Sequence, residues 1–293
     1  MSWSALTEAR RRERPRTTFL VDGQVVGSVD DAHVAVLRRW PQAVALQADA
    51  VTLRLPRPDR DAWFAQANQA LRAEGLIRAW RDETFALFSP GSGAVLALLE
   101  RASTRFWGTL TLGAHCNGWV AGDDGRPAWL WVARRSDHKP TDPSKHDNLV
   151  GGGVPFGQSP FEALVREGFE EAGLGPDRMA QAVHAGVLEL QRDIPEGLQF
   201  ERLHAFDLQL QPGEQPVNQD GEVAAVECLP VAEAARLAAA GEMTVDAALV
   251  TLDFLLRHGL LASDPEGPAL AAAMARLRLA PEGASAPARA RSS

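Results

Sequence analysis

Residues 151–174 read GGGVPFGQSPFEALVREGFEEAGL, and this segment constrains the structure more tightly than any other. It joins a run of glycines to a stretch whose apolar residues recur at helical spacing. A glycine at 173 and a proline at 176 follow, which is the usual stop signal of a helix. The sequence therefore predicts a glycine loop and then a helix that starts near Ser159.

Three carboxylates lie on one face of this expected helix, because Glu167, Glu170 and Glu171 stand at positions i, i+3 and i+4. Like charges at this spacing raise one another's pKa unless a positive charge lies among them. Mg²⁺ or Mn²⁺ meets that need, since hard cations take oxygen ligands and are shared between carboxylates and substrate phosphates. The alternative is a solvated acidic face, which is the common outcome for such a triplet taken alone.

Two neighbours of these carboxylates fit the metal hypothesis. Arg166 precedes Glu167 and lies four residues before Glu170, so we expect it to orient a carboxylate by a charge-assisted hydrogen bond. A glycine allows the backbone to approach a ligand closely, and we expect the carbonyl of Gly151 to face the metal.

The whole stretch resembles the Nudix box, Gx5Ex7REUxEExGU, where U is a bulky aliphatic residue. Two positions depart from that pattern: Gln158 stands where the first Glu belongs, and Gly168 stands where an aliphatic residue belongs. Gln158 keeps hydrogen bonding but loses charge, so we expect activity to survive. Gly168 costs on the order of 1 kcal/mol in a helix interior, and we expect Phe169 or its neighbours to fill the space. The matching positions are Gly152, Arg166, Glu167, Glu170, Glu171, Gly173 and Leu174.

The resemblance implies an α/β fold, namely the Nudix α/β/α sandwich with a mixed sheet, preceded by a small α/β N-terminal domain. It also implies a hydrolase that cleaves a phosphoanhydride bond of a small diphosphate to give a monophosphate. Metal ions held by the three glutamates and the Gly151 carbonyl would bridge the diphosphate and help to deprotonate a water molecule. The residues expected to be catalytic are Glu167, Arg166, Glu170 and Glu222.

The phrases WLWVARRS and DNLVGGG resemble the Nudix branch that carries an extra N-terminal domain and is labelled thiamin pyrophosphokinase-related. Some fungal and plant members of that branch hydrolyse diphosphates of thiamin and of its damaged forms. A hydrolase is expected rather than a kinase, because the chain has no GxxxxGK[ST] loop. Two alternatives stay open: a nucleotide-directed hydrolase acting on NADH, ADP-ribose or an oxidised nucleotide, and a non-catalytic sensor that binds a phosphorylated ligand.

Several charged groups outside the box are candidates for the site. Many Nudix enzymes supply a further carboxylate from a loop before a late strand, and here Glu222 holds that place, with Asp220 and Glu201 as alternates. An ordinary polar turn is the equally weighted alternative. Basic side chains before the glycine loop are expected to neutralise substrate phosphates, again with simple exposure as the alternative; they are Arg134, Lys139 and Lys145, with Arg135 beside them. A zinc site at His115 is disfavoured, because no completing ligand set accompanies it.

Sequence pattern and composition divide the chain into a small α/β domain at 18–106, a Nudix domain at 107–260 and an Ala- and Pro-rich tail at 261–293. We expect at most one helix of the tail to pack on the rest of the chain. Within the first part the pattern predicts a hairpin around Asp22 and a second helix at 93–102. In the Nudix part it predicts a hairpin around the turn DDGRP, further strands, and helices from about 232 to 259.

Composition limits the partners. The 293 residues carry a net charge of -8, which disfavours a nucleic-acid polymer, so anionic small molecules must be bound by local positive charge. Two cysteines indicate a reducing cytoplasm, and no apolar run predicts a membrane span. The arginines at 10–16 are expected to be an exposed, frayed terminus rather than a transit-like or polyanion-binding arm. We expect a monomer or homodimer.

Overall fold

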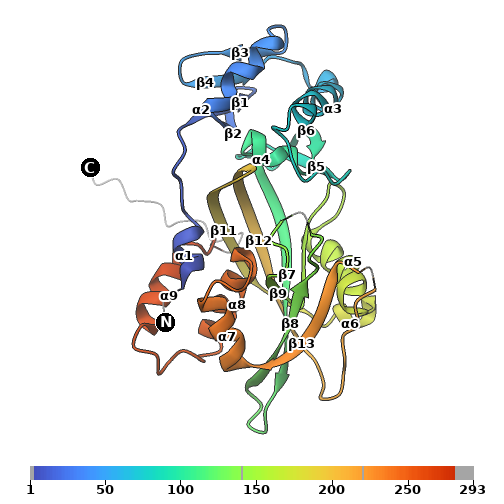
Figure 1. Cartoon of the computed structure of the whole chain (residues 1–293), viewed down its shortest axis with the longest axis vertical. Helices are drawn as coiled ribbons and strands as arrows, with labels where there is room; N and C mark the ends of the chain where they lie inside the picture. Colours follow the sequence, from blue (N-terminus) through green and yellow to red (C-terminus); the bar gives the residue numbers. More distant parts are fainter. Residues whose placement is uncertain (1–2, 140, 220, 281–293) are drawn as a thin grey trace, which may run out of the picture.

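The computed structural model describes residues 3–139, 141–219 and 221–280. The upper part of Figure 1 contains a four-stranded sheet in the order β2-β1-β4-β3. Its first two strands form the predicted hairpin, turning at Asp22 and Gly23 with φ of 52° and 74°. The elements here are β1 (Arg16–Val21), β2 (Gln24–Asp30), α2 (Asp31–Val34), η1 (Ala35–Arg39), β3 (Val44–Leu46), β4 (Ala50–Leu53) and α3 (Arg57–Ala73).

A two-stranded sheet of β5 (Thr84–Phe88) and β6 (Val95–Glu100) follows, and the short helix α4 (Ser103–Trp107) leads out of it. The predicted helix at 93–102 is therefore wrong. The run VLALLE has no polar positions at helical spacing, and pairing with β5 decides its conformation. Phe19, Phe64 and Trp107 are fully buried at the centre of this part of the molecule.

The second body is a seven-stranded mixed sheet with the order β11-β12-β7-β8-β13, where β10 pairs with β7 and β9 pairs with β8. Only the β7 and β12 pairing is parallel. The strands are β7 (Leu110–Ala121), β8 (Pro127–Arg135), β9 (His146–Asn148), β10 (Val150–Gly153), β11 (Val183–Ile194), β12 (Gly197–Gln209) and β13 (Val223–Pro230).

Helices cover both faces of this sheet (Figure 1). Leu203 and Ala205 of β12 pack with α7 (Val231–Ala239) and α8 (Val245–Arg257), whereas Phe206 and Leu208 belong to the core beneath α5 (Pro160–Ala172). Odd and even positions of one strand thus face different helix layers, as strand geometry requires. The short α6 (Pro176–Met179) packs on α5. The expected α/β/α sandwich is confirmed; the division at residues 107 and 261 stays a prediction.

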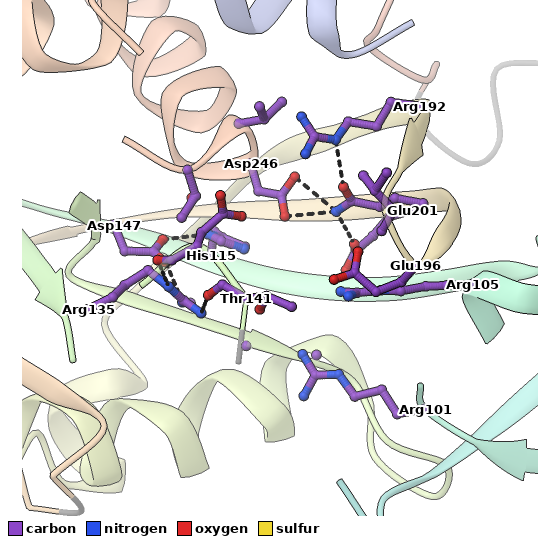
Figure 2. Close-up of a pocket in the computed structure, with 18 of the residues that line it drawn as sticks. Arg101, Arg105, His115, Arg135, Thr141, Asp147, Arg192, Glu196, Glu201 and Asp246 are labelled. Carbon is purple, nitrogen blue, oxygen red and sulfur yellow. Dashed lines mark hydrogen bonds and ion pairs between the residues drawn. The ribbon is translucent and has the colours of Figure 1, made fainter. Parts of the chain in front are cut away.

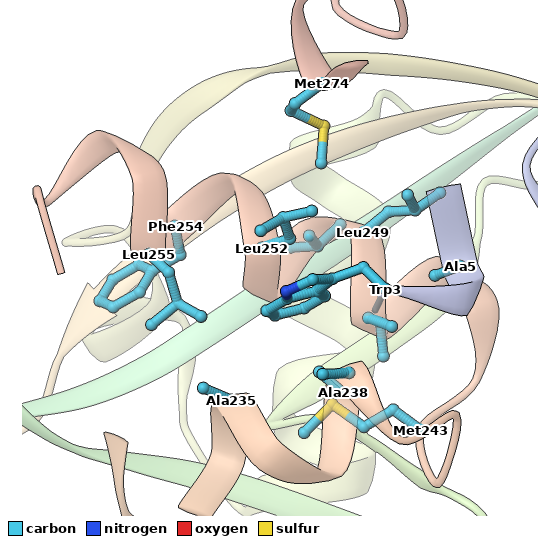
Figure 3. Packing of buried hydrophobic residues seen from close by; sticks show 14 of the residues in the cluster. Trp3, Ala5, Ala235, Ala238, Met243, Leu249, Leu252, Phe254, Leu255 and Met274 are labelled. Atoms are coloured by element: carbon cyan, nitrogen blue, oxygen red, sulfur yellow. The ribbon is translucent and has the colours of Figure 1, made fainter. Parts of the chain in front are cut away.

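The N-terminal segment is docked rather than frayed, which corrects the sequence expectation. Trp3 is 4% exposed and lies among residues of α7 and α8 in Figure 3, directly before α1 (Ser4–Glu8). The carbonyls of Ala9 and Arg11 accept hydrogen bonds from the backbone of β11 at 2.9 and 2.8 Å. Near the other end, α9 (Gly267–Ala275) packs on α8. In the described part of the chain, no helix is both long and apolar enough to cross a membrane.

The docked tryptophan gives a stability prediction. Truncating a buried Trp to Ala removes its packing and leaves a cavity, so Trp3→Ala is expected to lower the free energy of unfolding by about 3 kcal/mol. Guanidinium denaturation followed by circular dichroism measures the change. Trp129→Ala is the matched control, because that side chain is 43% exposed and should cost far less. Equal effects of the two substitutions would contradict the docking of Trp3.

Candidate active site

Helix α5 has well-defined ends. The Ser159 hydroxyl accepts a hydrogen bond from the backbone of Glu162, whose carboxylate accepts one from the backbone of Ser159 in return. This capping box satisfies backbone donors that the helix itself leaves unpaired. At the other end Gly173 adopts a left-handed conformation, with φ of 66°. The acidic face is therefore carried by a helix whose register is fixed at both termini.

The glycines before the helix form strand β10, and each one leaves space for a different side chain. A Cβ on Gly152 would collide with the carboxylate of Glu167. A Cβ on Gly151 would lie 2.8 Å from the ring of His115, and one on Gly153 would lie 3.0 Å from the guanidinium carbon of Arg101. The strand thus brings a carboxylate, an imidazole and a guanidinium against one short length of backbone.

Glu171 is buried, with 6% of its surface exposed, and accepts a hydrogen bond of 2.9 Å from the backbone N–H of Gly151. Burial raises the pKa of Glu171 to about 8, and the nearby charge of Glu167 acts in the same direction. Burial also raises the pKa of Glu167. Two adjacent carboxylates are therefore held where their charged forms are poorly solvated.

Arg166 donates hydrogen bonds to two of the three box carboxylates, at 2.8 Å to Glu167 and 2.7 Å to Glu170. Across the residues that the structure describes, no three His, Cys, Asp or Glu side chains are gathered as a metal site. The chemistry of the donors nevertheless suits a hard divalent cation, because carboxylates whose pKa values are raised by burial gain most from a positive charge.

Lys139 and Glu222 form an ion pair beside the box. Burial lowers the pKa of Lys139, while the charges of Glu171 and Glu167 act to raise it, so its ammonium lies within electrostatic reach of both. The other expected phosphate-binding residues lie apart from the box. Lys145 pairs with Asp142 at 3.3 Å. Arg134 is exposed. Asp220, the alternate to Glu222 as the further carboxylate, lies outside the described residues.

A cavity of about 240 Å³ opens beside the glycine strand (Figure 2). Arg101 and Arg105 reach it from the segment between β6 and β7, and Arg135 reaches it from β8. Arg135 donates to Asp147 at 3.0 Å, and this pair forms part of the wall. Since side chains alternate along a strand, Arg135 points into the cavity while its neighbour Arg134 does not line it.

Carboxylates also line the cavity. The amide of Gln199 donates to Glu201 at 2.9 Å and to Asp246 at 3.0 Å, so two carboxylates share one donor. Burial raises the pKa of Asp246 to about 6, and the charge of Glu201 adds to the shift. Sequence reasoning missed Asp246, Gln199, Arg101 and Arg105, because no local pattern links them to the box.

The two departures from the box have different surroundings. A Cβ on Gly168 would lie 2.7 Å from the sulfur of Met179, so α6 fills the space that an aliphatic residue would occupy. Phe169 is 56% exposed and does not fill it, contrary to expectation. The side-chain oxygen of Gln158 is buried and has no hydrogen-bond partner within the described chain.

Comparison with known proteins agrees with this geometry. A family model described as the NUDIX domain matches residues 113–249, and a domain of unknown function, DUF4743, matches residues 4–111. Nudix hydrolase 24, chloroplastic, of Arabidopsis thaliana is 32% identical over 266 residues, which cover 89% of this chain and 72% of that protein. The chain belongs to the Nudix hydrolase family. Nudix hydrolases generally use divalent metal ions.

Further proteins show similarity at lower sequence identity. Nudix hydrolase 20, chloroplastic, of Arabidopsis thaliana is 31% identical over 264 residues, covering 85% of this chain and 70% of that protein. The NUDIX domain of Shewanella oneidensis NrtR, solved with ADP ribose, has a TM-score of 0.41 and 12% identity, covering 51% of this chain and 88% of that one. DR0079 of Deinococcus radiodurans has a TM-score of 0.43 and 20% identity, with 55% and 91% covered.

Restoring the first glutamate of the box tests the tolerance of that position. Gln158→Glu is expected to keep turnover within about threefold of wild type, because the new carboxylate lies near the N-terminus of α5, where the helix dipole favours negative charge. Steady-state hydrolysis of whichever diphosphate the enzyme accepts is the measurement. A collapse of activity would show that the uncharged amide of Gln158 has a specific role.

Proposed function

We propose that this Nudix hydrolase cleaves the phosphoanhydride bond of a small diphosphate to release a monophosphate, with Mg²⁺ or Mn²⁺ bound at the box. The hydrogen bond from Gly151 to Glu171 carries the proposal. It fixes a box carboxylate against the glycine strand, and the same strand forms part of the wall of the cavity. Metal-directed groups and a pocket large enough for part of a small molecule are therefore adjacent.

The chain supplies distinct groups for this reaction. Glu167, Glu170 and Glu171, with the carbonyl of Gly151, are the groups that would hold the metal. When bound, such an ion polarises a phosphoryl oxygen and lowers the pKa of a bound water molecule. Arg166 orients two of the carboxylates, and Lys139 places a positive charge beside them.

The organic part of the substrate faces Glu201 and Asp246 in this proposal. Glu201 and Asp246 offer carboxylate oxygens that accept hydrogen bonds or face a positive charge. Thiamin diphosphate, which carries a cationic ring and an amine, suits this wall, as do its damaged analogues. An exocyclic amine of a nucleobase suits it too, so NADH, ADP-ribose and oxidised nucleotides form the second candidate class.

A substrate panel tests the proposal. The purified protein is incubated with Mg²⁺ or Mn²⁺ and with thiamin diphosphate, its oxidised analogues, NADH, ADP-ribose or 8-oxo-dGTP, and released monophosphate is measured by chromatography. Turnover of a thiamin-type diphosphate supports the first candidate class, and turnover of a nucleotide supports the second. Binding without turnover of any compound would favour a non-catalytic sensor.

The box carboxylates give a direct prediction. Glu170→Gln and Glu171→Gln each remove a charge directed at the metal without changing side-chain shape, so each is expected to abolish turnover while the circular dichroism spectrum stays unchanged. Glu162→Gln on the same helix is the matched control, because Gln also fits a capping box and turnover should persist. Near-wild-type rates of either box variant at saturating Mg²⁺ would refute the assignment of this helix.

Glu222 pairs with Lys139, whose ammonium interacts electrostatically with Glu171 and Glu167 of the box. We propose that Glu222 acts as the general base for the attacking water, and Glu222→Gln is then expected to lower kcat by about 10²-fold or more. The rate is measured against pH and metal concentration, with the exposed Glu227→Gln on β13 as control. A loss under about threefold would remove Glu222 from the mechanism and direct attention to Glu201.

A further inference from the structure

Arg105 differs from the other arginines of the cavity. Its guanidinium lines the pocket, yet it forms no hydrogen bond or ion pair with any side chain or carbonyl that the structure describes. By contrast, Arg135 is held by Asp147, and Arg192 donates to Gln199 at 3.0 Å. A half-buried guanidinium presents several donors at fixed angles, and donors without a protein partner are available to a ligand in the cavity.

A second arginine lies at the same end of the cavity. Arg101 donates to Glu83 at 3.0 Å, with its guanidinium carbon 5.5 Å from the ring centre of Phe85 and packed against Gly153. Burial lowers the pKa of Arg105, and the positive charge of Arg101 lowers it further. Two like charges are therefore kept together in a partly desolvated place, where an anion would stabilise both.

The acidic residues of the cavity do not supply an anionic partner for Arg105. The negative charges of Glu196, Glu201 and Asp246 act to raise the pKa of Arg105, but none of these carboxylates forms an ion pair with it. Two of them, Glu201 and Asp246, accept hydrogen bonds from Gln199 instead. Carboxylates and guanidinium groups thus lie side by side in the cavity, and Arg105 is not taken up by any of these carboxylates.

The position of Arg105 is fixed by its backbone. The chain turns from β11 to β12 at Gly197, whose φ is 138°, and a Cβ there would collide with the carbonyl oxygen of Arg105. Helix α4 therefore lies directly on the hairpin turn, with no side chain between them. Arg101 reaches toward the box as well, since its charge lowers the pKa of Glu167.

We propose that Arg101 and Arg105 bind the diphosphate group of the substrate, so that the part of the chain matched by DUF4743 completes the active site. The inference rests on the proposed function, because it takes the diphosphate as the group that is bound. Guanidinium groups suit phosphate oxygens, as their planar donors pair with two oxygens at once. The diphosphate would then lie between these arginines and the carboxylates of α5.

Binding of inorganic pyrophosphate tests this proposal without turnover. Isothermal titration calorimetry is run on the full chain in EDTA, so that protein groups rather than metal determine affinity. Arg105→Met is expected to weaken binding about tenfold or more, the scale of one charge-assisted hydrogen bond. Arg39→Met is the matched control, because Arg39 is exposed and pairs with Glu74 in the same part of the chain, and affinity should not change.

Thermal unfolding shows whether weaker binding by a variant is caused by a destabilised fold. Arg105 loses no partner when it is replaced, so Arg105→Met should unfold at or above the wild-type temperature. If Arg105→Met unfolds at a lower temperature than wild type, the binding test is repeated with Arg101→Gln, whose side chain can still form a hydrogen bond with Glu83. Weaker pyrophosphate binding by that variant supports the proposal, and unchanged binding overturns it. Failure of the wild-type protein to bind pyrophosphate, or equal affinity of Arg105→Met and Arg39→Met, would also overturn it. If pyrophosphate binding depends on the arginines but the protein hydrolyses no compound of the substrate panel, the hydrolase proposal is refuted and the arginine proposal stands.

Discussion

The site depends on three consecutive glycines, because the space that a side chain would take at each glycine is occupied by a side chain from a different element. Gly151 leaves room for a ring on β7, Gly152 for a carboxylate on α5, and Gly153 for a guanidinium that precedes α4. The contacts are so close that a methyl group at any of the three positions would force a neighbour to move. The rest of the site depends on this strand, since its three glycines lie against the helix, the sheet and the N-terminal part of the molecule.

The sequence predicted what local spacing determines. The position of α5, its stop at Gly173 and the common face of its glutamates follow from helix geometry. The strand at 95–100 was missed because a short apolar run suits either conformation until a partner is known. Phe169 was expected to fill the gap at Gly168, but Met179 does so from a helix whose packing the sequence does not reveal.

The cavity arginines show a different limit. Arg101 and Arg105 lie far before the box in sequence, in a stretch with no motif, and only the docking of α4 on the β11 and β12 hairpin brings them to the glycine strand. The net charge of -8 indicated that anions must be bound by local positive charge. Composition could not say where that charge lies, because location is a property of tertiary packing.

The cavity also brings both signs of charge together. Guanidinium groups from the N-terminal part line it together with the carboxylates of Glu201 and Asp246. In the confined, poorly solvated space such groups act more strongly than they would in water. A ligand that carries both negative charge and hydrogen-bond donors would therefore find partners for both within one cavity.

The docked N-terminus imposes an order on folding. Trp3 packs among side chains of α7 and α8, and Arg10 donates to the carbonyl of Arg276, 266 positions further along the chain. Residues 3–10 therefore acquire these partners only after the segment that reaches residue 276 has been synthesised. Until then their apolar face stays exposed, and closure of so long a loop makes this contact one of the last to form.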